Sequence, residues 1–230
     1  DWTAVFVGVA AMCAAGGLAA IWLVPEPPHL GPPAPGLRLA ALGRAWADRR
    51  LRASVLGYFG HMWELYTMWV LLPLVLALRL DDDNAVSWAA FLVMGAGALG
   101  CIGGGIVARR WGSARVAGFQ LATSALCCLL APWAVVAPVQ GFMLWLLVWG
   151  ISVAGDSPQF SALTASNAPP GAVGSVLTLV NCIGFAISVL SIELFVRLAG
   201  AQPLAALLPW LALGPVLGLW ALRPLLAPAR

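Results

Sequence analysis

Long apolar stretches alternate with short polar connections along the whole chain. A helix needs about 20 apolar residues to cross the hydrocarbon core of a bilayer. Seven stretches meet this length, at approximately residues 3–24, 54–78, 85–108, 116–137, 141–165, 172–196 and 204–222. The stretches are too long for transmembrane strands and lack alternating polarity. The pattern therefore predicts an all-α membrane protein with seven transmembrane helices.

The composition agrees with this class. The chain is 62% hydrophobic and only 9% charged, whereas a soluble domain contains about 25% charged residues. Its five cysteines lie inside apolar segments and lack the spacing of zinc ligands. We expect them to pack as small apolar residues, and we expect no metal, cofactor or nucleic acid to bind.

Arginine is unevenly distributed between the connections. The connections 25–53 and 109–115 and the C-terminal tail hold ten of the twelve arginines, whereas the alternate connections hold only Arg79 and Arg197. Because cytoplasmic loops carry an excess of basic residues, we expect these arginine-rich connections and the C-terminus to be cytoplasmic.

The connection 25–53 is the only long linker. It begins with a stiff, proline-rich stretch. From Leu37 to Arg52 it becomes amphipathic, which predicts a short helix along the cytoplasmic membrane surface. The chain thus divides into a single transmembrane helix (1–24), a cytoplasmic linker (25–53) and a six-helix bundle (54–230).

The second apolar segment contains His61 and Glu64. Ionisable residues at membrane depth usually face a protein interior or a water-filled path. The two residues are three apart and share a helix face, beside which lie Gly57 and Tyr58. Two interpretations stay open: a protonatable site lining a translocation cavity, or a hydrogen-bonded pair that holds helices together.

In the fifth segment, Asp156 precedes Pro158, and proline permits a kink because it removes a backbone hydrogen bond. Asp156 belongs either to a gating helix or to a salt bridge with Arg109 or Arg110 near the cytoplasmic end. Both interpretations remain open.

The sixth segment presents Gly174, Thr178, Asn181 and Ser188 on one approximate stripe. This stripe is either a polar wall of a cavity or a set of interhelical hydrogen bonds. We expect Glu64, His61, Asn181 and Thr178 to converge on one open side of the bundle.

The third segment ends in Gly105-Ile-Val-Ala-Arg109-Arg110-Trp-Gly112-Ser-Ala-Arg115. This run resembles the Gly-x-x-x-Asp-Arg-x-Gly-Arg loop of the major facilitator superfamily. Arg109 stands where Asp is usual and Ser113 where Arg is usual, which is typical of the degenerate second copy between family spans eight and nine. The proline-rich turn at 167–171 is similar to the entry to family span eleven, so the seven segments correspond to family spans six to twelve.

The resemblance implies that residues 54–230 form a half-bundle of two inverted three-helix repeats, and that five further spans precede Asp1. It implies a secondary active transporter of a small solute or ion, surrounded by membrane lipid, in a bacterial inner membrane. We expect proton coupling through Glu64, His61 and Asp156. The implied substrate-cavity residues are Tyr58, Gly57, Thr178 and Asn181. The implied gating and loop residues are Gly105, Arg109, Arg110, Gly112, Arg115 and Pro158.

Two short runs also resemble a bacterial branch near the nitrate/nitrite porters. They are His61-Met-Trp-Glu64-Leu-Tyr and Asp156-Ser-Pro158-Gln-Phe. An alternative function is a seven-span membrane receptor without enzymatic activity, although a retinal protein is excluded because the chain has no lysine. An enzyme is not expected, because the chain lacks H-E-x-x-H, G-x-S-x-G and any cysteine-histidine metal cluster.

Overall fold

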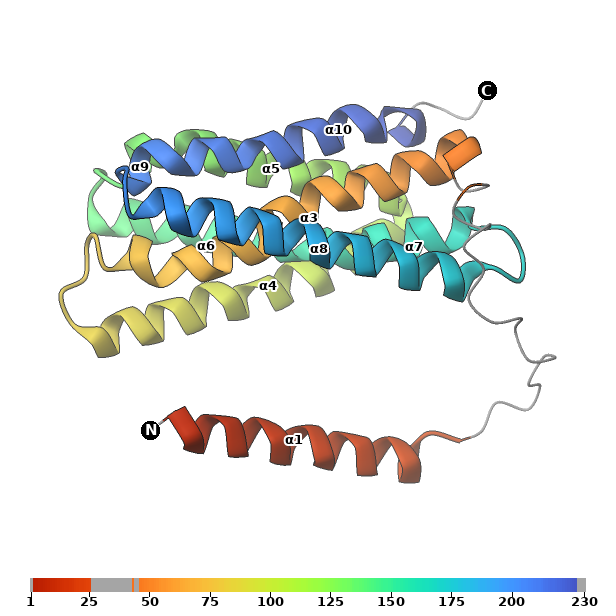
Figure 1. Ribbon diagram of the computed structural model, residues 1–230, viewed down its shortest axis with the longest axis horizontal. Coiled ribbons are helices and arrows are strands. Elements are labelled where there is room, and N and C mark those ends of the chain that lie inside the picture. The colour runs from red at the N-terminus through yellow and green to blue at the C-terminus, as the bar shows by residue number, and fades with distance from the viewer. Residues whose placement is uncertain (1, 26–42, 44–45, 227–230) are drawn as a thin grey trace. The chain divides into compact units, whose positions relative to one another are not determined.

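The computed structural model describes residues 2–25, 43 and 46–226, and these contain helices and no strand. The chain divides into two units, Asp1–Pro35 and Gly36–Arg230. The helix of the first unit is α1 (Trp2–Leu23), which buries none of its 22 residues (Figure 1). Half of the predicted surface helix 37–52, residues 37–42, 44 and 45, lies outside the described residues, and its last four residues form the first turn of α3 (Arg49–Leu76) instead.

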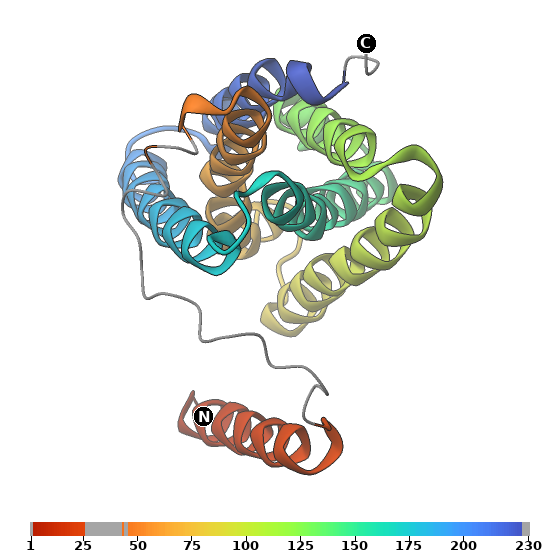
Figure 2. The same cartoon turned by 90° about the vertical axis from the view of Figure 1, so that its right-hand side faces the viewer.

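The second unit is a bundle of long helices, seen end-on in Figure 2. Its elements are α3 (Arg49–Leu76), α4 (Asp83–Trp111), α5 (Ser113–Ala134), α6 (Val139–Gly155), α7 (Ser157–Asn167), α8 (Val173–Ala199), α9 (Leu204–Leu207), the 3-10 helix η1 (Leu208–Ala212) and α10 (Leu213–Leu226). Helices α6 and α7 form one rod interrupted at Asp156, and the predicted kink corresponds to this interruption.

Six helical rods in the described chain are long and apolar enough to cross a membrane. They are α1, α4, α5, α6 with α7, α8, and the rod from α9 to α10. The seventh expected span is α3, which has 28 residues but a lower hydropathy than the others because it contains arginine, histidine and glutamate. The chain is therefore a multi-pass, all-helical membrane protein.

The predicted repeats correspond to α3, α4 and α5, and to the α6–α7 rod, α8 and α10. Helix α3 packs on α8 and α10, and the α6–α7 rod packs on α4 and α5. The first helix of each repeat thus contacts the second and third helices of the other. This reciprocal packing is consistent with a half-bundle of two related three-helix repeats.

Glycines allow the closest of these contacts. Gly60 of α3 lies against Gly214 and Gly218 of α10, where an added Cβ would overlap the Gly214 carbonyl oxygen. On the other side of the bundle, Gly100 of α4 lies equally close to the backbone of Ile151 on α6. Small residues let helix backbones approach in membranes, so these glycines set the spacing of α3 from α10 and of α4 from α6.

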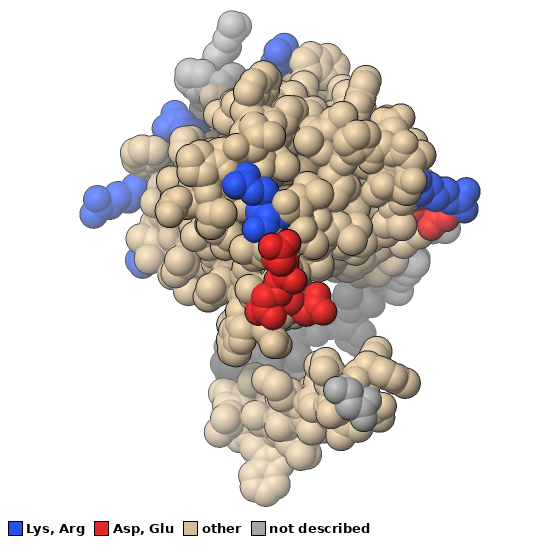
Figure 3. Space-filling model, turned by 90° about the vertical axis from the view of Figure 1, so that its left-hand side faces the viewer, with Lys and Arg blue, Asp and Glu red and all other residues tan. Residues whose placement is uncertain are grey.

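The two ends of the bundle differ in charge. The acidic run 81–83 is exposed at the connection from α3 to α4, and acidic side chains gather on that end (Figure 3). The opposite end carries the start of α3, with Arg49, and the end of α4, with Arg109 and Arg110. Arg79 and Arg197 are at the acidic end, after α3 and in the last turn of α8, so the other described arginines of the bundle gather at the opposite end.

Candidate functional site

The carboxylate of Glu64 is fully buried between α3, α5 and α6. Its Oε1 accepts hydrogen bonds from the indole N–H of Trp149 at 2.6 Å and from the thiol of Cys128 at 3.1 Å. Its Oε2 accepts from the hydroxyl of Ser124 at 2.9 Å. Among the described residues no cation pairs with Glu64. The three groups that donate to Glu64 are an indole, a thiol and a hydroxyl, and all of them are neutral.

One helical turn earlier on α3, His61 faces Asp156. The His61 Nδ1 lies 2.9 Å from Asp156 Oδ1, and both side chains are buried. Asp156 lies at the interruption between α6 and α7, so the pair joins α3 to the point where this rod is broken. The contact has ion-pair distance without hydrogen-bond alignment, and His61 Nε2 and Asp156 Oδ2 find no hydrogen-bond partner in the described part of the chain.

Burial limits which charges this cluster can hold. An isolated ion is strongly disfavoured in a low-dielectric interior, whereas opposite charges can be held as a pair. A protonated His61 beside an ionised Asp156 is neutral as a pair. Glu64 has no such partner among the described residues, so its neutral, protonated form suits the same interior.

The hydrogen bonds around Glu64 fit either charge state. When Glu64 is ionised, Ser124, Cys128 and Trp149 all donate to it. The Ser124 hydroxyl oxygen also lies 3.2 Å from the carbonyl oxygen of Leu121, to which it can donate instead. A protonated Glu64 can then donate from Oε2 to the Ser124 oxygen, so that no buried group loses its partner in either state.

The family model described as Major Facilitator Superfamily matches residues 1–192 of the 230 in the chain. The chain belongs to the Major Facilitator Superfamily. Members of this superfamily are transporters and not enzymes, so the chain is a transporter of the major facilitator type. The family assignment sets aside the receptor alternative. A comparison with curated proteins gives no match.

The predicted convergence of Glu64, His61, Asn181 and Thr178 on one open side of the bundle is wrong. Glu64 and His61 are fully buried within the bundle, whereas Thr178 and Asn181 are exposed on α8. The predicted stripe is divided in the structure. Ser188 packs on α3, where its hydroxyl donates to the carbonyl oxygen of Met62 at 2.7 Å, as the interhelical alternative predicts, whereas the earlier part of the stripe is exposed.

The other two residues predicted to line the cavity, Gly57 and Tyr58, are buried, unlike Thr178 and Asn181. Gly57 lies against the ring of Phe160, and Tyr58 lies against Gly184 of α8. Both positions therefore serve helix packing within this bundle. A role for any of the four residues in binding substrate stays a prediction.

A salt bridge from Asp156 to Arg109 or Arg110 is also wrong. Both arginines are exposed in the last turn of α4, while Asp156 is buried beside His61. The partner of Asp156 is therefore His61 on α3, and not an arginine at the end of the bundle. The gating interpretation of Asp156 stays a prediction.

The remaining residues of the predicted gating and loop set lie on the surface of the bundle. Gly105, Gly112, Arg115 and Pro158 are exposed, as are the two arginines at the end of α4. Gly112 joins α4 to α5 with a φ of +82°, a backbone conformation that glycine adopts without steric conflict. The motif therefore shapes a connection, and its role in gating stays a prediction.

Sequence reasoning missed the three residues that hold Glu64. Cys128 was expected only to pack, and neither Ser124 nor Trp149 was selected. Ser124 and Cys128 are four apart and so lie on one face of α5, which was a usable signal. Trp149 carried no such signal, because only the packing of α6 brings its indole N–H to Glu64.

Proposed function

We propose that the chain is part of a secondary active transporter that moves a small solute or ion by alternating access, driven by protons. The single observation that carries this proposal is the environment of Glu64: a buried carboxyl without a cation, surrounded by three neutral donors. Such a group can gain and lose a proton without leaving a partner unsatisfied. In a membrane interior, an ionisable residue of this kind favours function over structure.

In this proposal, proton binding at Glu64 is linked to movement through His61. Both residues are on α3, and His61 is paired with Asp156 at the α6–α7 interruption. A change in the angle between α6 and α7 would alter the distance between His61 and Asp156. Their pairing would then depend on the conformation of the transporter, as alternating access requires.

We assign the substrate path to surfaces of the bundle that the chain leaves exposed. Thr178 and Asn181 are polar, exposed and three residues apart on α8, so they are the candidates for contacts with substrate or with the other half of the transporter. We further propose that the arginine-rich end and the C-terminus are cytoplasmic in a bacterial inner membrane. A relation to the nitrate/nitrite porters remains a hypothesis based on the two short runs that contain His61 and Asp156.

The test uses the intact protein in liposomes that contain a pH-sensitive dye. A panel of small solutes is screened for one whose addition causes proton entry, and that solute is then used in labelled form. Glu64→Gln should abolish proton-driven accumulation of the solute but preserve its exchange across the membrane. Exchange needs only the conformational change, whereas accumulation needs the proton step.

The matched control is Glu193→Gln. Glu193 is exposed on α8 and pairs with Arg197, so the same chemical change is made outside the buried cluster. This variant should accumulate solute like the unmodified protein. Accumulation by Glu64→Gln against a gradient would overturn the assignment of the proton site.

A further inference from the structure

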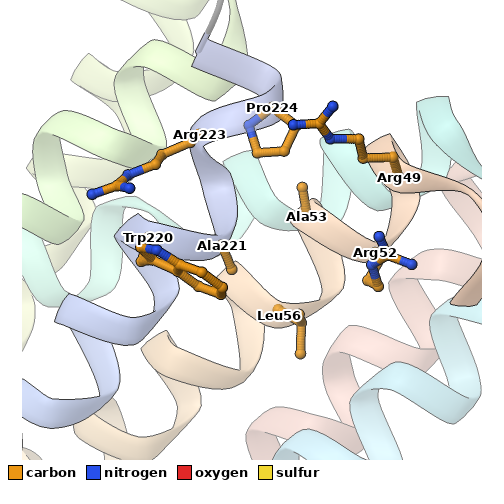
Figure 4. A pocket seen from close by; sticks show the side chains of 8 residues that line it. All are labelled: Arg49, Arg52, Ala53, Leu56, Trp220, Ala221, Arg223 and Pro224. Atoms are coloured by element: carbon orange, nitrogen blue, oxygen red, sulfur yellow. The ribbon is translucent and has the colours of Figure 1, made fainter.

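A basic pocket of about 340 Å³ opens between the start of α3 and the end of α10, away from the buried cluster. Its size is at the lower end of the range of about 300–1,000 Å³ for small-molecule sites. The pocket is lined by three arginines, one tryptophan and four further residues (Figure 4), namely Arg49, Arg52, Arg223, Trp220, Ala53, Leu56, Ala221 and Pro224.

The helical repeat explains why these residues meet. The four residues from α3 lie at positions 49, 52, 53 and 56, which is one face of a helix. Further along α3, Gly57 and Gly60 pack tightly on Gly218 and Gly214 of α10. The pocket thus begins where the glycine contacts end and larger residues separate the two helices.

The arginines of the pocket are not neutralised by the protein. Within the described ranges, Arg49, Arg52 and Arg223 form no ion pair. Arg52 donates to the carbonyl oxygen of Trp46 at 2.7 Å, which uses part of one guanidinium. The carboxylate of the neighbouring Asp48 caps α3 by accepting from backbone N–H groups. The pocket therefore carries a net positive charge that suits an anion with several oxygen atoms, such as a phosphate.

The walls of the pocket indicate which class of phosphate compound it binds. Figure 4 shows Ala53, Leu56 and Ala221 between the two helices, with Trp220 beside them and the guanidinium of Arg49 next to Pro224. Leading away from Trp220 along α10, the exposed residues are apolar and recur at helical spacing: Trp220, Leu217, Val216 and Leu213. An acyl chain can lie along this face while a headgroup reaches the arginines.

We propose that this pocket binds the phosphate of an anionic phospholipid whose acyl chains lie along α10. A tryptophan at the end of an apolar helix face is typical of the membrane interface, and basic pockets between transmembrane helices bind acidic headgroups. A soluble phosphate ester has the same phosphate chemistry but no group for the apolar face. A lipid is therefore the occupant that uses both the arginines of the pocket and the apolar face of α10 beside it.

The test measures lipid retained by the intact, purified protein in detergent, using native mass spectrometry. The probes are dioleoylphosphatidylglycerol, dioleoylphosphatidylcholine and soluble glycerol 3-phosphate. The variant is the triple change of Arg49, Arg52 and Arg223 to Gln. The triple variant should lower the affinity for phosphatidylglycerol by at least about tenfold, because each basic residue near an anionic headgroup adds to the free energy of lipid binding.

The matched control changes Arg109, Arg110 and Arg115 to Gln. This control removes the same three charges from the same end of the bundle but outside the pocket. It should change phosphatidylglycerol affinity less than about twofold, because removed charges outside the pocket act only through screened, long-range attraction. Equal losses in the two triple variants would overturn the proposal, because they would show attraction to charge without a site.

Two further measurements keep the outcome decisive if the triple variant folds poorly. Ala221→Phe fills the pocket without changing any charge, and it should also prevent retention of phosphatidylglycerol while leaving phosphatidylcholine unaffected. Normal retention by this variant would overturn the proposal. Binding of glycerol 3-phosphate as tight as that of the lipid would assign the pocket to soluble phosphate esters and would also overturn it.

Discussion

Two polar sites lie one helical turn apart on α3 and are built in opposite ways. Glu64 accepts three hydrogen bonds from α5 and α6. His61 and Asp156 have one contact between them, and each keeps an atom without a hydrogen-bond partner within the described residues. Both sites are buried to the same extent, so burial alone does not decide how a polar group is accommodated.

The difference follows from the helices that supply the partners. Ser124 and Cys128 lie within α5, and Trp149 lies within α6, so regular helix geometry holds their donors in place. Asp156 lies where the α6–α7 rod is interrupted. A group held by regular helices can change charge without moving its surroundings, whereas a pair across an interruption responds to movement of the backbone. The two sites therefore suit proton binding and conformational sensing respectively.

The largest expected effect comes from removing one member of the pair. Asp156→Leu should lower the free energy of unfolding by about 3–5 kcal/mol, because it leaves His61 buried without its counter-charge. The measurement is reversible unfolding of the purified protein in mixed detergent micelles. The double variant His61→Leu with Asp156→Leu should recover much of the loss. Equal destabilisation in the single and double variants would contradict a charged pair.

Removal of the shortest hydrogen bond to Glu64 should have the next largest effect. Trp149→Phe keeps an aromatic ring in place but removes the indole N–H, and it should lower the free energy of unfolding by about 1.5–3 kcal/mol. The same change made together with Glu64→Leu should cost clearly less, because the acceptor is already absent. Additive losses would show that Trp149 acts through packing alone.

Compared with the indole N–H of Trp149, the hydroxyl of Ser124 should contribute less to stability and more to proton exchange at Glu64. Ser124→Ala should lower the free energy of unfolding by about 1 kcal/mol, and it should slow proton entry because a protonated Glu64 loses its acceptor. Ser152→Ala is the control, since buried Ser152 donates only to carbonyl oxygens of its own helix. Equal proton entry in the two variants would argue against the proposed role of Ser124.

The smallest effect on stability is expected on the exposed stripe of α8. Thr178→Val keeps the shape of the side chain, and a substitution at an exposed site should change the free energy of unfolding by less than about 0.5 kcal/mol. Solute uptake should nevertheless fall if the stripe contacts the substrate. Unchanged uptake together with unchanged stability would remove Thr178 from the substrate path.

The fold class could be predicted because it depends on averages over long segments. Twenty or more apolar residues identify a span whatever its neighbours are, and the glycine and arginine pattern after the third segment pointed to the family. The interruption near Asp156 was predictable for a similar reason, since the effect of Pro158 on the backbone is local.

The candidate site was only half predictable. His61, Glu64 and Asp156 were selected because a charged group in an apolar segment is conspicuous in the sequence itself. Their surroundings were predicted wrongly: an open face shared with Thr178 and Asn181 was expected, and so was a salt bridge to the arginines of α4. Which face of α8 meets α3 depends on how the backbone of Gly184 and the side chain of Ser188 fit against α3, and this fit has no signature in one sequence.

The amino-acid sequence by itself determined that the protein is an all-helical membrane protein, which residues would be hard to bury, and which connections between helices carry most of the positive charge. These properties follow from the transfer of single residues or single helices between water and lipid. Only the tertiary structure decided that Trp149, Cys128 and Ser124 surround Glu64 and that Asp156 meets His61. Hydrogen bonds and ion pairs act over a few ångströms, so they depend on how each helix is rotated and placed against its neighbours.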